Sequence, residues 1–146
     1  MAARKINVKL QTSDLVQNYF EHSYCLACQS TLPFYTFVQR INNIFFINCS
    51  LIIEHGLEDK DGNQYKLLYD DDPSLNLKYY VIGNRERTNF LIPELKNMDY
   101  IFMVRGLKLV PELLEDCLPK LQKMKSLTYA HEFEPMKIKS IENLVL

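Results

Sequence analysis

The sequence has no tryptophan, only four glycines and a net charge of −1 at neutral pH. With so few glycines, few positions allow the backbone to hinge freely. The nearly balanced charge excludes a general electrostatic attraction to nucleic acid or to an anionic membrane surface. No apolar run approaches the roughly 20 residues of a membrane-spanning helix. Residues 1–10 are basic without an apolar segment behind them, so we expect neither a membrane span nor a signal peptide.

The composition that remains is typical of a globular protein. Hydrophobic residues make up 47% of the 146 positions, with nine tyrosines and eight phenylalanines. A chain of this length fits one domain over residues 1–146 and can bury a substantial core. We expect a cytoplasmic protein, in which the four cysteines stay reduced.

Residues 91–106 form the stretch around which the fold is expected to be organised. Tyr100 to Val104 is apolar without interruption, so both faces of an extended chain are apolar there. This pattern predicts a central strand over Asp99–Arg105 that is covered on both sides. Gly106 is expected to end it, because glycine readily takes the backbone angles of a turn. Pro93 favours one helical turn at its entrance.

Two main helices are expected, over about 31–45 and 111–124. In the first, Thr31 is the expected N-cap, and apolar residues from Phe34 to Phe45 recur along one face of a 3.6-residue helix. In the second, Pro119 lies inside the apolar pattern and is expected to kink the helix or to divide it. Residues 15–20 fit a short helix, or a long bent strand that runs into Tyr24.

Alternating or continuous apolar segments predict the strands. Segments 65–70, 77–84 and 99–105 are expected to form an antiparallel meander, with residues 70–74 as a loop. Further strands are expected at 6–10, 24–28 and 127–133, and the tail 138–146 is expected to lie over the body. The predicted fold is therefore α+β, with a mostly antiparallel sheet of about five to seven strands and the two helices packed on it.

Within the central stretch, Ile92-Pro93-Glu94 is followed after three residues by Met98-Asp99-Tyr100. This pattern resembles the signature of the IPExxxVDY family of small bacterial proteins, with methionine where valine is usual. The tail 126–146 also resembles the ending of that family. The resemblance implies a compact cytoplasmic domain. It implies no reaction, because the function of the family is unknown.

Five residues around this motif form the candidate functional surface: Glu94, Asp99, Tyr100, Arg85 and Arg87. The two arginines follow the strand expected beside the central one, so they are predicted to approach the loop that carries Glu94. We favour a non-enzymatic binding or protein-interaction module, which binds itself as a homodimer or another protein. The alternative is an enzyme of unknown class with Glu94 and Asp99 as acid and base in a cleft. Both carboxylates also fit a purely structural capping role.

No catalytic, metal or cofactor site is predicted. Cys25 and Cys28 form a CxxC pair, but residues three apart on a strand point to opposite faces, which favours packing over shared metal or redox chemistry. The three histidines are scattered along the chain. Asp70 to Asp72 form an acidic run, but one run seldom supplies the distributed ligands of a magnesium site.

Overall fold

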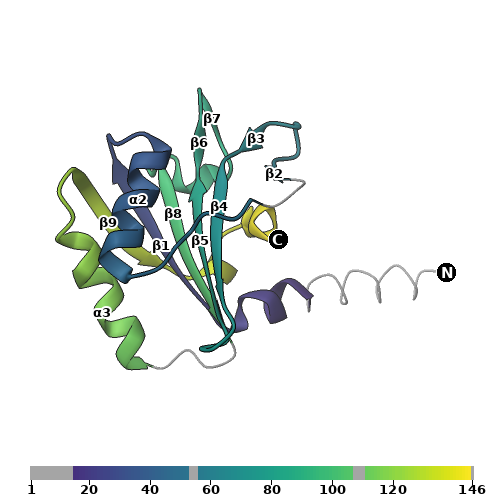
Figure 1. Ribbon diagram of the computed structural model, residues 1–146. Coiled ribbons are helices and arrows are strands. Elements are labelled where there is room, and N and C mark those ends of the chain that lie inside the picture. The colour runs from purple at the N-terminus through teal and green to yellow at the C-terminus, as the bar shows by residue number, and fades with distance from the viewer. Residues whose placement is uncertain (1–14, 53–55, 107–110, 146) are drawn as a thin grey trace.

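The computed structural model describes residues 15–52, 56–106 and 111–145, and the predicted strand 6–10 lies outside them (Figure 1). The fold is α+β, as predicted. Its main sheet has five antiparallel strands in the order β4-β5-β8-β1-β9. Their bounds are β1 (Ser23–Ser30), β4 (Leu67–Asp72), β5 (Leu77–Gly83), β8 (Tyr100–Gly106) and β9 (Leu127–Phe133).

The central position of β8 is confirmed. It pairs with β5 on one side and with β1 on the other, and all five residues from Tyr100 to Val104 are buried. Tyr100 and Phe102 belong to one core cluster, and Ile101 and Met103 belong to a second cluster on the opposite face. The uninterrupted apolar sequence therefore reflects a strand that packs on both faces.

Helices α2 (Phe34–Phe45) and α3 (Pro111–Gln122) cover the first face (Figure 1). The predicted N-cap was wrong: α2 begins at Phe34, and Pro33 is its N-cap without a side-chain hydrogen bond. Pro33 itself has an extended backbone with ψ 155°, and a proline disfavours helical geometry in the residue before it, so the helix begins at neither Leu32 nor Pro33. The rings of Phe37 and Tyr100 stack with centroids 4.2 Å apart, which joins α2 to the centre of the sheet.

Helix α3 ends at Gln122, two residues before the predicted end, and continues through Pro119 as one element. Pro119 and Glu115, four residues earlier, are both exposed, so water can hydrate the carbonyl that loses its amide partner. Of the two outcomes predicted for Pro119, a kink or a division, the division does not occur. Cys117 and Leu121 bury its inner side against the first core cluster.

Short elements cover the second face. They are the helical residues 15–21, the hairpins β2 (Leu57–Glu58)–β3 (Gln64–Tyr65) and β6 (Arg85–Glu86)–β7 (Asn89–Phe90), and the 3-10 turns η1 (Pro93–Leu95), η2 (Pro135–Lys137) and η3 (Ile141–Leu144). Phe20, Ile141 and Leu144 are buried among them. The helical alternative for residues 15–20 and the docking of the tail are thereby confirmed.

The acidic run is part of a strand, and its prediction as a loop was wrong. Asp70 and Asp71 pair with β5 within β4, and Asp72 ends the strand. Asp70 accepts a hydrogen bond from the amide of Asn48, and Asp72 accepts hydrogen bonds from the amide and hydroxyl of Ser74 in the following turn. These local bonds satisfy two carboxylates on an edge strand, where charged side chains remain in water.

Gly106 ends β8, but for a different reason from the predicted one. Its backbone is outside the left-handed region, which among the described glycines is adopted by Gly56 and Gly62. A Cβ on Gly106 would lie 2.4 Å from Leu77 Cδ2 and 2.6 Å from the carbonyl oxygen of Asn76. Glycine is therefore needed for the close approach of the β4–β5 turn to the end of β8.

Candidate functional site

A buried asparagine organises the loop that carries the IPE motif. Asn84 follows β5 and is fully buried. Its side-chain Nδ2 donates hydrogen bonds to the carbonyls of Leu95 (3.0 Å) and Met98 (2.9 Å), and its Oδ1 accepts from the amide of Ile92 at 2.8 Å. Its backbone amide and carbonyl add two further bonds to the same loop. One side chain thus supplies partners for three backbone groups of the loop that lie outside the β6–β7 ladder.

Sequence reasoning missed Asn84. The only available signal was an asparagine placed directly after a strand that ends in glycine, a pattern that is common in exposed turns. Its burial depends on the path of the loop 84–99, which folds back over the end of β5. Local patterns do not predict such a path.

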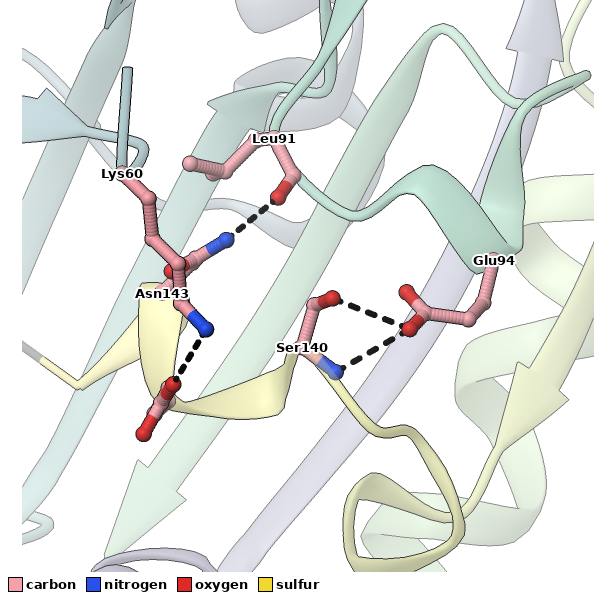
Figure 2. A network of polar contacts seen from close by, with 6 residues as sticks. Lys60, Leu91, Glu94, Ser140 and Asn143 are labelled. Atoms are coloured by element: carbon pink, nitrogen blue, oxygen red, sulfur yellow. Dashed lines mark hydrogen bonds and ion pairs between the residues drawn. The ribbon is translucent and has the colours of Figure 1, made fainter. Parts of the chain in front are cut away.

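Glu94 does not join the arginines. Its Oε1 accepts hydrogen bonds from the amide (3.2 Å) and the hydroxyl (2.9 Å) of Ser140, as Figure 2 shows. The arginines lie beside Asp99, at the end of the loop that carries Glu94, but Glu94 itself does not line their hollow and binds Ser140 of the C-terminal segment instead. Glu94 lies in the first turn of η1, as the capping interpretation placed it, but the hydrogen-bond partner of its carboxylate is 46 residues away rather than in its own turn.

Two further contacts hold the C-terminal segment, one against the same loop and one against the β2–β3 hairpin. Asn143 Nδ2 donates to the carbonyl of Leu91 at 2.8 Å, and Lys60 Nζ lies 3.5 Å from Glu142 Oε1 (Figure 2). Leu144 is fully buried beneath them. The motif residue Glu94 therefore contacts the C-terminal segment and not the hollow of the arginines.

The other four predicted residues come together at one open hollow of about 550 Å³. It lies where β1 ends and β8 begins. Its lining comes from β1 and the following turn, from the β6–β7 hairpin, from the start of β8 and from β9: Gln29, Ser30, Thr31, Leu32, Arg85, Arg87, Asp99, Tyr100 and Thr128. Glu94 is not among them, so the paired carboxylates required by the enzyme hypothesis do not share this hollow.

Asp99 and Tyr100 form the fixed floor of the hollow. Asp99 Oδ2 accepts a hydrogen bond from the amide of Ser30 at 3.1 Å, which fastens the end of β1. The hydroxyl of Tyr100 donates to the carbonyl of Leu32. Burial, followed by the negative charge of Asp99, raises the pKa of Tyr100, so this hydroxyl stays protonated at neutral pH.

Arg85 and Arg87 form the rim. Both are exposed, and in the part of the chain that the structure describes the two ion pairs are Lys60–Glu142 and Lys137–Glu134, so neither arginine has a carboxylate partner there. Arg85 Nε donates to the carbonyl of Arg87 at 3.2 Å, and its Cζ lies 5.9 Å from the ring centroid of Phe90. These contacts orient one guanidinium before any ligand arrives.

The cysteines are packing residues. Cys25 and Cys28 lie in opposite core clusters, so they do not converge on one site. Burial raises the pKa of the Cys25 and Cys49 thiols to about 12 and also raises the pKa of Cys28 and Cys117. No disulfide links the four cysteines, and no cluster of three or more possible metal ligands occurs within the described ranges.

Comparison of the chain with models of protein families, with curated proteins and with solved structures finds no match. Among the described residues, no helix is long and apolar enough to cross a bilayer. The function proposed below therefore rests on the geometry of Arg85, Arg87 and the hollow beside them.

Proposed function

We propose that this protein is a non-enzymatic interaction module that binds an acidic segment of a partner protein at the Arg85–Arg87 hollow. The observation that carries the proposal is the pair of exposed guanidiniums on the rim of one polar hollow, neither with a carboxylate partner in the described ranges. Guanidinium groups match carboxylates through two parallel hydrogen bonds. An acidic side chain of a partner would supply the acceptors that the protein itself does not provide.

The polar lining supports a peptide over an apolar ligand. Thr31 and Thr128 are exposed beside the arginines, and their hydroxyls can donate to or accept from a peptide backbone. The floor is fixed by Asp99 and Tyr100, so binding requires little ordering of the protein.

A second copy of the chain remains one candidate partner. Within the described ranges, β9 pairs only with β1, which leaves its outer edge open along seven residues. Antiparallel pairing of two such edges would form a symmetric dimer. Size-exclusion chromatography with light scattering tests this part of the proposal: a concentration-dependent dimer supports self-association, and a monomer at all micromolar concentrations contradicts it.

Peptide binding tests the hollow directly. Fluorescence anisotropy compares a labelled octaglutamate peptide with an octaglutamine peptide. The acidic peptide is expected to bind tighter, with an affinity that falls as salt rises. Each exposed ion pair contributes up to about 1 kcal/mol. The Arg85→Gln/Arg87→Gln variant should therefore lose about 10- to 30-fold in affinity.

The matched control removes the same number of positive charges from another part of the surface. Lys137 and Lys139 are exposed on the C-terminal segment, and the Lys137→Gln/Lys139→Gln variant removes two positive charges away from the hollow. It should bind octaglutamate almost as well as the unmodified chain. Equal losses in the two double variants would show a general charge effect and would contradict the proposal.

Arg87 also allows recognition to be separated from stability. Its φ is 57°, a left-handed conformation that costs a non-glycine residue about 1 kcal/mol. Arg87→Gly removes the cation and relieves this cost, so the melting temperature should stay level or rise while affinity for the acidic peptide falls. A fall in both the melting temperature and the affinity would indicate a structural role for Arg87.

Membership of the IPExxxVDY family and a cytoplasmic location stay predictions from the sequence.

A further inference from the structure

A second, smaller hollow lies at the opposite end of β8, where β1 begins and β4 turns into β5. Its volume is about 260 Å³. The helical residues 15–21, the β4–β5 hairpin and the end of β8 supply its lining: Asn18, Tyr19, His22, Asp71, Asn76, Lys78, Arg105 and Gly106. The absence of a side chain on Gly106 lets Asn76 approach β8 and closes one side of this hollow.

Arg105 is the unusual residue in this hollow. Its Cζ lies 3.4 Å from the ring centroid of Tyr19, a distance typical of face-to-face stacking. Stacking leaves the N–H groups unsatisfied, because they lie in the plane of the guanidinium. The Nε of Arg105 is buried and has no hydrogen-bond partner in the described part of the chain. A buried charged donor without an acceptor is rare in proteins.

A second cation lies directly beside it. Lys78 on β5 and Arg105 on β8 are paired across the ladder, so their side chains leave the same face of the sheet next to each other. Two like charges in this position repel each other. Asp71 is the cross-strand partner of Lys78 on its other side, yet it forms no ion pair with either cation within the described residues. Neither Lys78 nor Arg105 therefore has a carboxylate within ion-pair distance among the described residues.

We propose that this hollow binds the phosphate group of a small phosphorylated molecule. The phosphate oxygens would accept hydrogen bonds from Arg105 in the plane of its guanidinium and would form an ion pair with Lys78. The side-chain amides of Asn18 and Asn76 are further possible donors. A phosphate monoester carries a charge of about −1.5 to −2 at neutral pH, which matches two cations better than one carboxylate does. The small volume limits the rest of the ligand to a few atoms. This site is independent of the Arg85–Arg87 hollow.

Titration with inorganic phosphate, followed by the amide spectrum of the full chain at constant ionic strength, tests the site. Saturable shifts are expected at the residues that line the hollow. Acetate should bind at least about fivefold more weakly, since it carries one charge. If phosphate and acetate bind equally, or if the shifts do not saturate, the phosphate site is refuted.

Variants locate the site and control for charge. Arg105→Gln should weaken phosphate binding by about tenfold or more, because it removes a charge-assisted donor pair. Lys78 is exposed, so the Lys78→Gln variant should fold even if Arg105→Gln does not. It should weaken phosphate binding severalfold. Asp71→Asn should tighten it severalfold by removing a repulsive carboxylate. Arg85→Gln should leave phosphate affinity unchanged; an equal loss there, or none in Lys78→Gln, would overturn the assignment.

Discussion

Replacing Asn84 by alanine should destabilise the protein severely, because one buried side chain satisfies three backbone groups of the loop 84–99. The amide of Ile92 and the carbonyl of Leu95 are buried with it, and each would lose its partner. A buried polar group left unsatisfied costs about 1–3 kcal/mol. The two together give about 2–6 kcal/mol, a large part of the roughly 5–15 kcal/mol that stabilises a domain.

Urea unfolding followed by circular dichroism measures this loss, since the chain lacks tryptophan as a fluorescence probe. With a slope of about 2 kcal/mol per molar urea, the middle of the usual range, the midpoint should fall by about 1–3 M. Asn89→Ala is the matched control, because Asn89 is exposed and donates one long hydrogen bond to Asn63 at 3.4 Å. Its effect should stay within about 0.5 kcal/mol. If the two variants unfold at the same urea concentration, the organising role of Asn84 is refuted.

Three further predictions follow from single contacts. Gly106→Ala should lower stability by about 1–3 kcal/mol, because its Cβ would overlap the backbone of Asn76; a melting temperature equal to that of the unmodified chain would contradict this. The thiol of Cys25 has a folded pKa of about 12, so the folded form keeps its proton where the unfolded form, with a pKa of about 8.5, loses it. The resulting stability is complete below about pH 8.5 and is lost as pH rises towards 12. Urea midpoints should fall over that range, and the cysteines should react with a thiol reagent only on unfolding; fast labelling of the native chain would show that they are accessible. Glu94→Ala should raise the amide exchange rate of Ser140 severalfold with little change in melting temperature, since both its bonds are exposed. A large loss of global stability would show that this contact does more than hold the tail.

The elements with a clear apolar pattern were predicted well from the sequence. The strand β8, the buried face of α2 and the strand β9 each have a pattern whose period alone determines the element. Even there, boundaries depend on neighbours. Pro33 prevents α2 from beginning at Thr31, and the pairing of Asp70 with Tyr79 on β5 turns a predicted loop into a strand.

The candidate surface was predicted only in part. Asp99 and Tyr100 lie beside the arginines because their strand neighbours the one that leads into Arg85, which the meander predicted. Glu94 lies outside this surface, because its carboxylate binds Ser140 of the C-terminal segment. Long-range contacts of irregular segments have no periodic signal in the sequence, so neither this contact nor the burial of Asn84 was predictable.

Amide shift mapping with the acidic peptide tests the central claim most directly. On addition of octaglutamate to the labelled chain, the largest shifts should occur at Thr31, Arg85, Arg87 and Thr128, around one hollow of the surface. The Arg85→Gln/Arg87→Gln variant should lose them. Shifts spread over all basic residues, or confined to the Arg105 hollow at the other end of β8, would contradict the proposed binding surface.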